Sequence, residues 1–285
     1  MITTTPNAPT TPAQSADPRR AGATAHALRV KLVERAFTLL GGPAHGPSKI
    51  AAVTGLHVTV VHRILQSMLP SQYVVQLPGG KYRLGPGAVT IGIQAMAHTP
   101  GVEASQPLLE SLSETFDAMA QLWVLSPYGH PRQMLADYAP GRYDLDALGL
   151  TARKLVTVHS SLRVGPSGRA IAAHLPAALI EMVLAQDLPD GADPGVLNEH
   201  EFRATLEEIR ASGYSLGIDE FAGWAAVAAP VLWGNTVYGA LSVLKPTSLL
   251  TDVAAVAAQT KAAAGRLSLL VAGRRLETPS SPRLR

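Results

Sequence analysis

The sequence of 285 residues contains no cysteine. This absence excludes disulfides, thiolate zinc sites and cysteine nucleophiles, and it fits a cytosolic protein. Charged residues make up only 16% and aromatic residues 5%, but hydrophobic residues reach 47%. We therefore expect most of the chain to fold around a core rather than to stay disordered. The length leaves room for about two domains.

Long hydrophobic runs are also missing. The most apolar stretch, residues 225–233, is far shorter than the roughly 20 residues that a membrane span requires. The C-terminal apolar segment is interrupted by Lys261 and Arg266. The chain does not open with a basic segment followed by an apolar run, so we expect neither a secretory signal nor a membrane partner.

Sequence motifs of the common enzyme classes are absent as well. The chain has no Walker loop and no Gly-x-Gly-x-x-Gly motif, and its nine histidines are dispersed, so we expect no catalytic residue, no cofactor and no metal site. The segment Gly165-Pro166-Ser167-Gly168-Arg169 is similar to a nucleophile elbow, but an arginine stands where that motif needs its second glycine. A serine hydrolase using Ser167 remains the remote alternative, because triads assemble in space.

Charge is distributed unevenly along the chain. Residues 1–100 carry nine Lys or Arg against two acids, which gives +7. Because the whole chain carries +3, residues 101–285 carry −4. Phosphate neutralisation dominates nucleic-acid affinity, so a basic front half indicates contact with a polyanion. The alternative is a front domain that is basic by chance, and charge alone does not separate the two.

The basic half predicts a helix-turn-helix. Residues 1–25 are rich in Thr, Pro, Ala and Ser, and we expect a disordered tail there. Apolar residues follow helical spacing over 33–40 and again over 61–69. Between these segments, Ser48 is placed to cap a short helix that ends at Gly55. Two short helices separated by a tight glycine turn are typical of a helix-turn-helix.

A hairpin follows these helices directly. Residues 73–77 and 81–85 read as two strands joined by Pro-Gly-Gly, which makes the whole a predicted winged helix. Polar side chains outside the buried stripes are the candidate DNA contacts: Ser48, Thr59, His62, Arg63, Gln66, Ser67, Lys81 and Arg83. Arg63 and Gln66 are long enough to reach base edges, and Lys81 and Arg83 reach phosphate or the minor groove. For the helix alone, a solvated outer face is the alternative interpretation.

The rest of the chain predicts a linker helix and an α+β domain. A helix within 86–101 carries Val89, Ile93 and Met96, and we expect this stripe to pack against a second copy of the chain. Beyond it, we predict an antiparallel sheet with flanking helices over 102–272 and a disordered tail over 273–285. The strands are expected at 121–125, 133–138, 154–158, 225–232 and 237–244, and helices at about 168–174, 177–184, 199–211 and 252–270.

Fragments over most of residues 30–271 resemble the IclR family of bacterial transcription regulators. They are Val33-Glu34-Arg35-Ala36, Val61-His62-Arg63-Ile64-Leu65, Lys81-Tyr82-Arg83-Leu84-Gly85, Gly168-Arg169-Ala170, Gly213-Tyr214, Val227-Ala228-Ala229-Pro230 and Ala240-Leu241-Ser242-Val243. The resemblance implies a winged helix-turn-helix over 26–85, a linker helix over 86–101 and a GAF-like effector domain over 102–272. It also implies a cytoplasmic, nucleoid-associated homodimer or homotetramer that binds palindromic double-stranded DNA and responds to a small-molecule effector.

The resemblance also points to an effector site that departs from its relatives. The candidate residues are Trp123, Gly165, Ser167, Asp219, Ala226, Ser242 and Leu244. In acid-sensing relatives a cysteine and a second serine stand at Ala226 and Leu244, and a histidine stands at Arg163. We therefore expect an apolar pocket that prefers a larger hydrophobic or aromatic compound. The alternative is an unused pocket in a ligand-independent developmental or architectural DNA-binding regulator.

Overall fold

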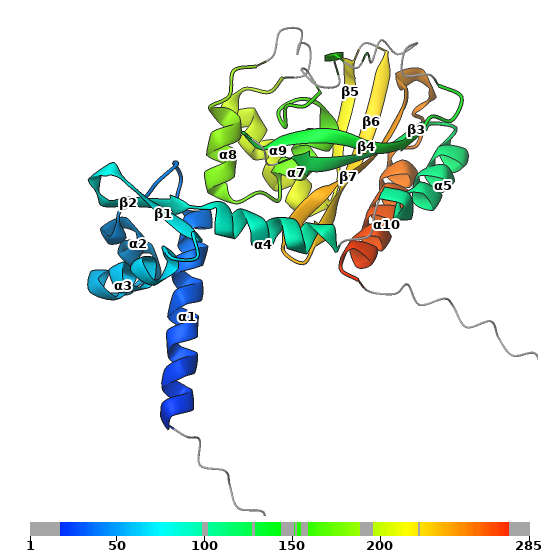
Figure 1. Ribbon diagram of the computed structural model, residues 1–285. Helices are drawn as coiled ribbons and strands as arrows, with labels where there is room; N and C mark the ends of the chain where they lie inside the picture. The colour runs from blue at the N-terminus through cyan, green and yellow to red at the C-terminus, as the bar shows by residue number, and fades with distance from the viewer. Residues whose placement is uncertain are drawn as a thin grey trace, which may run out of the picture. The chain divides into compact units, whose positions relative to one another are not determined.

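A computed structural model describes residues 18–98, 102–126, 129–143, 151, 153–154, 159–188, 196–221 and 223–273 (Figure 1). The chain forms two compact units, Met1–Val89 and Thr90–Arg285, each of which is described by itself. Within the described ranges, no helix combines the length and apolar character needed to span a bilayer.

The first unit is a three-helix bundle with a two-stranded hairpin. Its elements are α1 (Pro18–Leu39), α2 (Pro47–Thr54), α3 (Val58–Met68), β1 (Val74–Leu77) and β2 (Lys81–Leu84). This order confirms the predicted winged helix-turn-helix pattern. The expectation of a disordered tail through residue 25 is wrong for residues 18–25, whose backbone is helical. The alanines of this segment have the highest helix propensity, and a proline is well tolerated at a helix start.

The predicted apolar stripes form the core of the first unit. The buried residues are Val33, Ala36, Leu40, Ile50, Val61, Ile64, Leu65, Met68, Val74 and Tyr82. Four of them lie on α3 at helical spacing, so that one face of α3 packs inward and the other stays exposed. The orientation of the exposed face of α3 is therefore set by its buried face.

Helix capping differs from the prediction at the start of α2. Gly46 is the N-cap of α2 and Pro47 follows it, so Ser48 is already inside the first turn and does not cap the helix. The helix begins two positions earlier than expected because Pro47 has a fixed φ that suits the first helical position. At α3 the N-cap is His57, whose Nδ1 accepts a hydrogen bond from the Thr59 backbone N–H at 3.3 Å. The Thr59 side chain therefore does not cap α3.

The second unit is an antiparallel five-stranded sheet with helices on both faces. Its elements are α5 (Gln106–Phe116), β3 (Met119–Ser126), β4 (Arg132–Ala139), α7 (Gly165–Ala172), α8 (Ala177–Leu184), α9 (Glu199–Ser212), β5 (Ser215–Phe221), β6 (Trp224–Trp233), β7 (Thr236–Pro246) and α10 (Val253–Val271). The strand order is β4-β3-β7-β6-β5. The α+β fold class is confirmed. The predicted linker helix is α4 (Pro86–Ala97), which spans the boundary between the two units.

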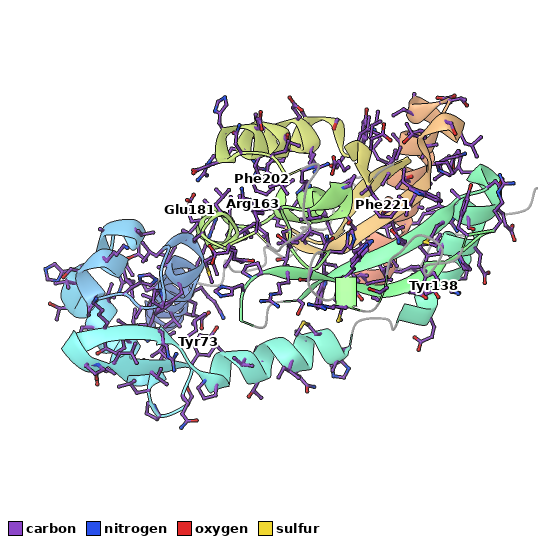
Figure 2. All side chains as sticks on the ribbon, turned by 90° about the horizontal axis from the view of Figure 1, so that it is seen from above. Tyr73, Tyr138, Arg163, Glu181, Phe202 and Phe221 are labelled. Atoms are coloured by element: carbon purple, nitrogen blue, oxygen red, sulfur yellow. The ribbon has the colours of Figure 1, made fainter. Side chains whose placement is uncertain are left out.

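The two faces of the sheet serve different layers. Figure 1 shows α5 and α10 on one side of the sheet and α7, α8 and α9 on the other. Leu122, Val227 and Leu241 point to the first side, where they pack with α5 and α10. On the opposite side, Trp123 packs in a separate cluster with Phe202 of α9, which Figure 2 labels. Strand residues alternate between the two cores, as the pleat requires.

The structure contains one strand that was not predicted, and one predicted strand falls mostly outside the described residues. The segment Ser215–Phe221 forms the edge strand β5, although Gly217 and two adjacent acids give it low strand propensity. Pairing with β6 forms the strand in spite of its composition. The strand predicted at 154–158 lies almost wholly outside the described residues. The pairing of Trp233 with Thr236 closes a tight hairpin between β6 and β7.

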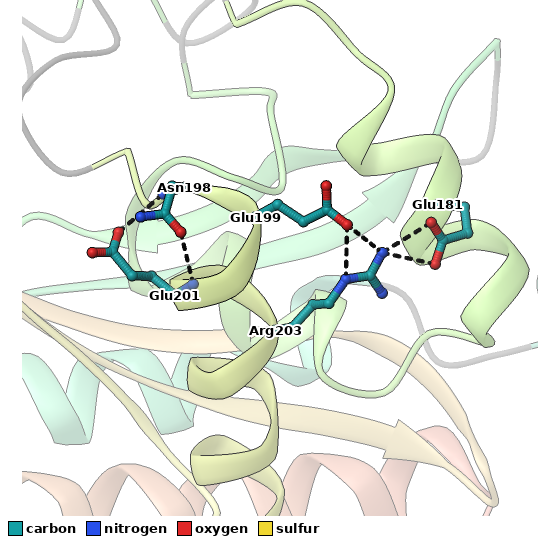
Figure 3. Close-up of polar contacts among 5 residues, drawn as sticks. All are labelled: Glu181, Asn198, Glu199, Glu201 and Arg203. Carbon is teal, nitrogen blue, oxygen red and sulfur yellow. Dashed lines mark hydrogen bonds and ion pairs between the residues drawn. The ribbon is translucent and has the colours of Figure 1, made fainter.

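Polar contacts fix the start of α9 and join it to α8 (Figure 3). The Asn198 side chain accepts a hydrogen bond from the Glu201 backbone N–H, and the Glu201 carboxylate accepts one from the Asn198 backbone N–H, each at 3.0 Å. This reciprocal pair is a capping box. The Arg203 guanidinium contacts both Glu199 of α9 and Glu181 of α8. The two helices are thereby held together at the surface of the α7 side of the sheet.

Candidate functional site

The first candidate site is the exposed surface of α3 and the hairpin. All eight predicted DNA-contact residues are exposed: Ser48 on α2, Thr59, His62, Arg63, Gln66 and Ser67 on α3, and Lys81 and Arg83 on β2. The side chain of Arg63 makes no hydrogen bond or ion pair with any described residue, and the same is true of the side chains of Lys81 and Arg83. These guanidinium and ammonium groups are therefore available to an external partner.

Charge on this surface has one sign. Among the described residues of the first unit the single acid is Glu34, and it pairs with Lys31 of α1 at 2.6 Å. The cations of α3 and the hairpin are consequently not neutralised within the described part of the unit. Exposed cations without acidic partners on α3 and the hairpin are suited to contact with the phosphate backbone of a nucleic acid.

Gln66 connects α3 to the hairpin. Its Nε2 donates a hydrogen bond to the Tyr82 hydroxyl at 2.7 Å. The Tyr82 side chain is fully buried, and the His62 ring meets it edge-on at a centroid distance of 6.5 Å. The Gln66 amide nitrogen is therefore used inside the unit, which removes one of the donors that the sequence assigned to base contact. The hydrogen bond instead holds α3 in a defined position relative to β2.

A buried histidine extends the hairpin. His45 and Tyr82 exchange two backbone hydrogen bonds of 2.8 Å. The residue before α2 is thereby joined to β2 by a single antiparallel β-bridge. Burial lowers the pKa of His45, and the nearby charge of Lys49 lowers it further. The imidazole is thus held in its neutral form, which is the form that a buried site without a counter-ion favours.

The second candidate site is a cavity of about 80 Å³ on the α7 side of the sheet. It is lined by Gln121, Trp123, Gln133, His159, Val164, Gly165, Pro166, Ser167, Gly217, Glu220, Phe221, Trp224, Ala226, Ser242 and Leu244. Six of the seven predicted effector residues are in this lining, and Asp219 is not. Pockets for drug-sized ligands have about 300–1,000 Å³, so this cavity suits a smaller molecule than the sequence suggested.

Two small residues on neighbouring strands, Gly217 and Ala226, form part of the cavity wall. Ala226 of β6 pairs with Leu244 of β7, and Gly217 of β5 pairs with Ala226. A Cβ atom on Gly217 would lie 2.7 Å from Pro166 Cγ and 2.6 Å from a Glu220 oxygen. Glycine at this position therefore lets α7 approach β5 closely. The cavity lies where these small side chains leave the sheet uncovered.

A bulge decides which acid faces the cavity. The pairing of β5 with β6 shifts between Ile218 and Phe221, and Asp219 has a φ of 56°. The Asp219 carboxylate accepts a hydrogen bond from the Thr247 hydroxyl at 2.8 Å, and the next residue, Glu220, lines the cavity instead. Of the two adjacent acids, the structure thus places Glu220 in the cavity lining and leaves Asp219, the residue expected from the sequence, outside it. A bulge turns side chains out of the regular alternation, which no local pattern in the sequence revealed.

Glu220 forms an ion pair with Arg169 of α7. The Arg169 side chain is only 2% exposed; its Nη1 donates to Glu220 Oε2 at 2.9 Å and its Nη2 donates to the other carboxylate oxygen. Nη2 also donates to the Leu216 carbonyl at 3.3 Å. The planar guanidinium suits this two-pronged contact, for which lysine has no equivalent. The pair joins α7 to β5 and neutralises the acid at the cavity wall.

The start of α7 opens on the cavity. The N-cap is Val164, which provides no side-chain cap, and Gly165 has a φ of 75°. Backbone N–H groups in a first helical turn have no partner within the helix, and they favour an anion. Ser167 in this turn also lines the cavity, and its hydroxyl has no hydrogen bond to a described residue. This edge of the cavity is therefore suited to a carboxylate.

Sequence reasoning missed several lining residues. Arg163, labelled in Figure 2, donates to the Leu197 carbonyl at 3.2 Å and is not part of the lining. A histidine nevertheless reaches the cavity from another position, His159. Burial lowers the pKa of His159, with a further contribution from Lys154. Gln121 was within reach of pattern analysis, because it lies two residues before Trp123 and hence on the same face of the strand.

We expect the ion pair to stabilise the second unit. Replacing Arg169 by Met leaves the Glu220 carboxylate unpaired in a mostly buried position, which costs about 3 kcal/mol of unfolding free energy. In the double variant Arg169→Met/Glu220→Leu most of that loss is recovered, because no charge is left behind. All three tryptophans lie in the second unit, so urea unfolding followed by tryptophan fluorescence reports on it. Equal stability of the single variant and the wild type contradicts this role.

Comparison with known proteins addresses the identity of the chain. No family model matches the sequence. The chain is 26% identical over 212 residues to the HTH-type transcriptional regulator KipR of Bacillus subtilis, a match that covers 70% of this chain and 80% of KipR. The matched protein is thus a regulator with a helix-turn-helix, the motif found in the first unit.

Solved structures with the same fold carry the IclR name. The Thermotoga maritima IclR structure matches with a TM-score of 0.53 at 14% identity, over 89% of this chain and 99% of that one. A Silicibacter protein described as an IclR transcriptional regulator matches with a TM-score of 0.51 at 24% identity, over 88% and 99%. An IclR homologue of Microbacterium hydrocarbonoxydans, solved with 4-hydroxybenzoate, matches with a TM-score of 0.50 at 20% identity, over 87% and 99%.

The two comparisons agree. The similarity to a helix-turn-helix regulator and the likeness to solved IclR structures each extend over most of the chain. The chain is therefore similar in sequence to a helix-turn-helix transcriptional regulator, and it has the fold of the IclR structures.

Proposed function

We propose that this regulator binds a palindromic operator as a homo-oligomer and that a small carboxylate in the cavity of the second unit modulates it. The proposal is carried by the surface of α3 and the hairpin, where exposed cations have no acidic partner among the described residues. As a bacterial operator-binding protein it acts in the cytoplasm, at the nucleoid. The operator contacts, the oligomer and the effector are argued separately below.

Base reading and phosphate contact are assigned to different residues. Arg63 projects from the exposed face of α3 without an intramolecular partner, which suits a guanine edge in the major groove. Lys81 and Arg83 lie on β2 and suit the phosphate backbone. Gln66 is placed one turn from Arg63, but its amide nitrogen is bound to Tyr82. We therefore assign Gln66 chiefly to the position of the helix, with its second amide N–H and its carbonyl oxygen left for a base contact.

Two substitutions distinguish these roles. We expect Arg63→Ala to cost about 1–3 kcal/mol at the preferred operator and to relax specificity at one position per half-site. We expect Lys81→Ala to weaken all sequences alike and to reduce the salt slope by about one. Competitive binding to a randomised operator library at several salt concentrations measures both, with Arg266→Ala on the exposed surface of α10 as control. A uniform loss for both variants shows that Arg63 does not read bases.

The linker helix α4 is assigned to self-association. Val89 is 54% exposed and Ile93 is 49% exposed, and the two lie four residues apart on one face of the helix. Apolar side chains at this spacing on an otherwise uncovered helix suit a helix–helix contact. A two-fold dimer of the chain presents two copies of α3, which matches the symmetry of a palindromic site.

We expect Ile93→Asp to produce monomers. A charge in the centre of the apolar stripe has no partner in a helix–helix contact, so association weakens and operator affinity falls with it. Sedimentation velocity measures the oligomeric state, and an operator-binding assay measures the affinity. Gln94→Asp places the same charge outside the stripe and serves as the control. If the Ile93→Asp protein sediments like the wild type, the oligomer interface does not involve this face of α4.

The cavity is assigned to the effector. The first turn of α7 offers N–H donors for a carboxylate, and Trp123 and Phe221 provide apolar walls. A volume of about 80 Å³ limits the ligand to a small molecule. The structural relative from Microbacterium hydrocarbonoxydans was solved with a small aromatic carboxylate, 4-hydroxybenzoate, which is consistent with this class of ligand.

Filling the cavity tests this assignment. We expect Ala226→Leu to abolish saturable binding of small carboxylates such as benzoate and lactate, because the larger side chain occupies the ligand space, while operator binding persists. Isothermal titration calorimetry against a carboxylate panel measures ligand binding. Ala177→Leu on the exposed start of α8 is the matched control. If the wild type binds no member of the panel and still binds its operator, the ligand-independent regulator becomes the better description.

A further inference from the structure

We propose that the sheet side of the cavity selects an effector carrying an uncharged hydrogen-bonding group, a hydroxyl or a carboxamide, and that Gln121 and Gln133 are the residues that determine this specificity. The inference rests on the proposed role of the cavity as an effector site. Neither glutamine was among the residues that the sequence assigned to the site. Both line the cavity from neighbouring strands, Gln121 from β3 and Gln133 from β4.

The orientation of the Gln133 amide is determined by its surroundings. Its Nε2 donates to two backbone carbonyls, those of Ser161 at 3.3 Å and Val164 at 3.2 Å. An amide nitrogen donates and an amide oxygen accepts, so two carbonyl partners leave no ambiguity about which atom is which. The Oε1 atom is then directed elsewhere, and it has no partner among the described residues although the side chain is only 2% exposed.

Gln121 is oriented in the same way by a different contact. Its Oε1 accepts a hydrogen bond from the Trp123 indole N–H at 3.2 Å. Its Nε2 has only the Met119 sulfur at 3.5 Å, and a thioether is a weak acceptor. Gln121 is 4% exposed, so a buried donor is left with most of its capacity unused.

Ser242 completes the polar group on the sheet. It is the direct cross-strand partner of Gln121 and is 2% exposed, and its hydroxyl has no hydrogen bond to a described residue. Three residues that line the sheet side of the cavity thus carry unused capacity: an acceptor without a partner on Gln133, a donor with only a weak acceptor on Gln121, and the Ser242 hydroxyl, which can do both. Polar groups buried without partners are costly, so a ligand that supplies the missing partners gains affinity.

The charges around the cavity favour an uncharged group over an ammonium. The one acid in the lining, Glu220, is already paired with Arg169. His159 is kept neutral by burial, which lowers its pKa, and by the charge of Lys154. An ammonium buried beside the glutamines has no free counter-ion there and loses its hydration. A hydroxyl both donates and accepts, so it matches Gln133 and Gln121 without a charge.

Replacing a ligand hydroxyl by a methyl group isolates this preference from ligand size. The two groups are nearly equal in volume, but the methyl group covers the glutamines without bonding to them. Two matched pairs serve as probes: 4-hydroxybenzoate with 4-methylbenzoate, and lactate with 2-methylpropanoate. In the wild-type protein we expect the hydroxyl member of at least one pair to bind about tenfold more tightly by isothermal titration calorimetry.

Variants assign the preference to the two side chains. We expect Gln133→Met and Gln121→Met each to reduce the hydroxyl-to-methyl affinity ratio toward one, since methionine fills similar space without a strong donor or acceptor. Gln259→Met on the exposed surface of α10 is the matched control and leaves the ratio unchanged. A melting temperature for each variant separates altered recognition from misfolding.

The outcomes separate the inference from the proposal beneath it. Equal affinities within both pairs in the wild type overturn the inference alone and show that the glutamines are satisfied by bound water. An unchanged hydroxyl preference in both folded variants also overturns it. Binding of none of the four probes overturns the effector cavity and the inference together. The comparison of the hydroxyl and methyl probes in the wild-type protein needs no substitution. It therefore tests the inference even if a variant fails to fold.

Discussion

The ion pair between Arg169 and Glu220 holds the functional part of the second unit in place. It links α7 to the edge strand β5, and both elements border the cavity. Arg169 is buried, so water cannot readily take the place of Glu220 if the ion pair is broken. The bulge at Asp219 turns Glu220 toward Arg169, and Gly217 lets α7 approach closely enough for the contact. The position of the α7 N-terminus, and with it the anion-binding edge of the cavity, depends on these three features.

In the first unit, uncharged contacts hold α3 against the hairpin. The side chain of Tyr82 on β2 is buried; its hydroxyl accepts a hydrogen bond from Gln66 of α3, and its backbone exchanges two hydrogen bonds with His45. These contacts tie α3 to the hairpin around one aromatic side chain. The cations remain on the outside, where they meet no described acid. Exposed, unpaired cations on a packed unit suit contact with a charged backbone.

Some features of both sites could be read from the sequence. Helical spacing located α3, and the hairpin pattern located Lys81 and Arg83 on its second strand. Six of seven predicted effector residues line one cavity, because the motifs behind them mark fixed positions on β6, β7 and α7. The sequence did not reveal that Asp219 lies outside the cavity lining, because a bulge is a property of strand pairing. It also placed the N-cap of α2 at Ser48, whereas Pro47 starts the helix two residues earlier.

The sequence by itself determined the periodicity of the helices, the separation of a basic front from an acidic back, and the resemblance to one family. These are properties of residues close together in the chain, and they are set by propensity and patterning. Only the tertiary structure decided that Glu220 faces the cavity and that Gln121 and Gln133 meet there from different strands. It also decided which atoms of those amides are already used, Nε2 of Gln133 and Oε1 of Gln121. The reason is physical: strand register and long-range packing choose the partners of a buried polar group, and its unused capacity appears only once those partners are in place.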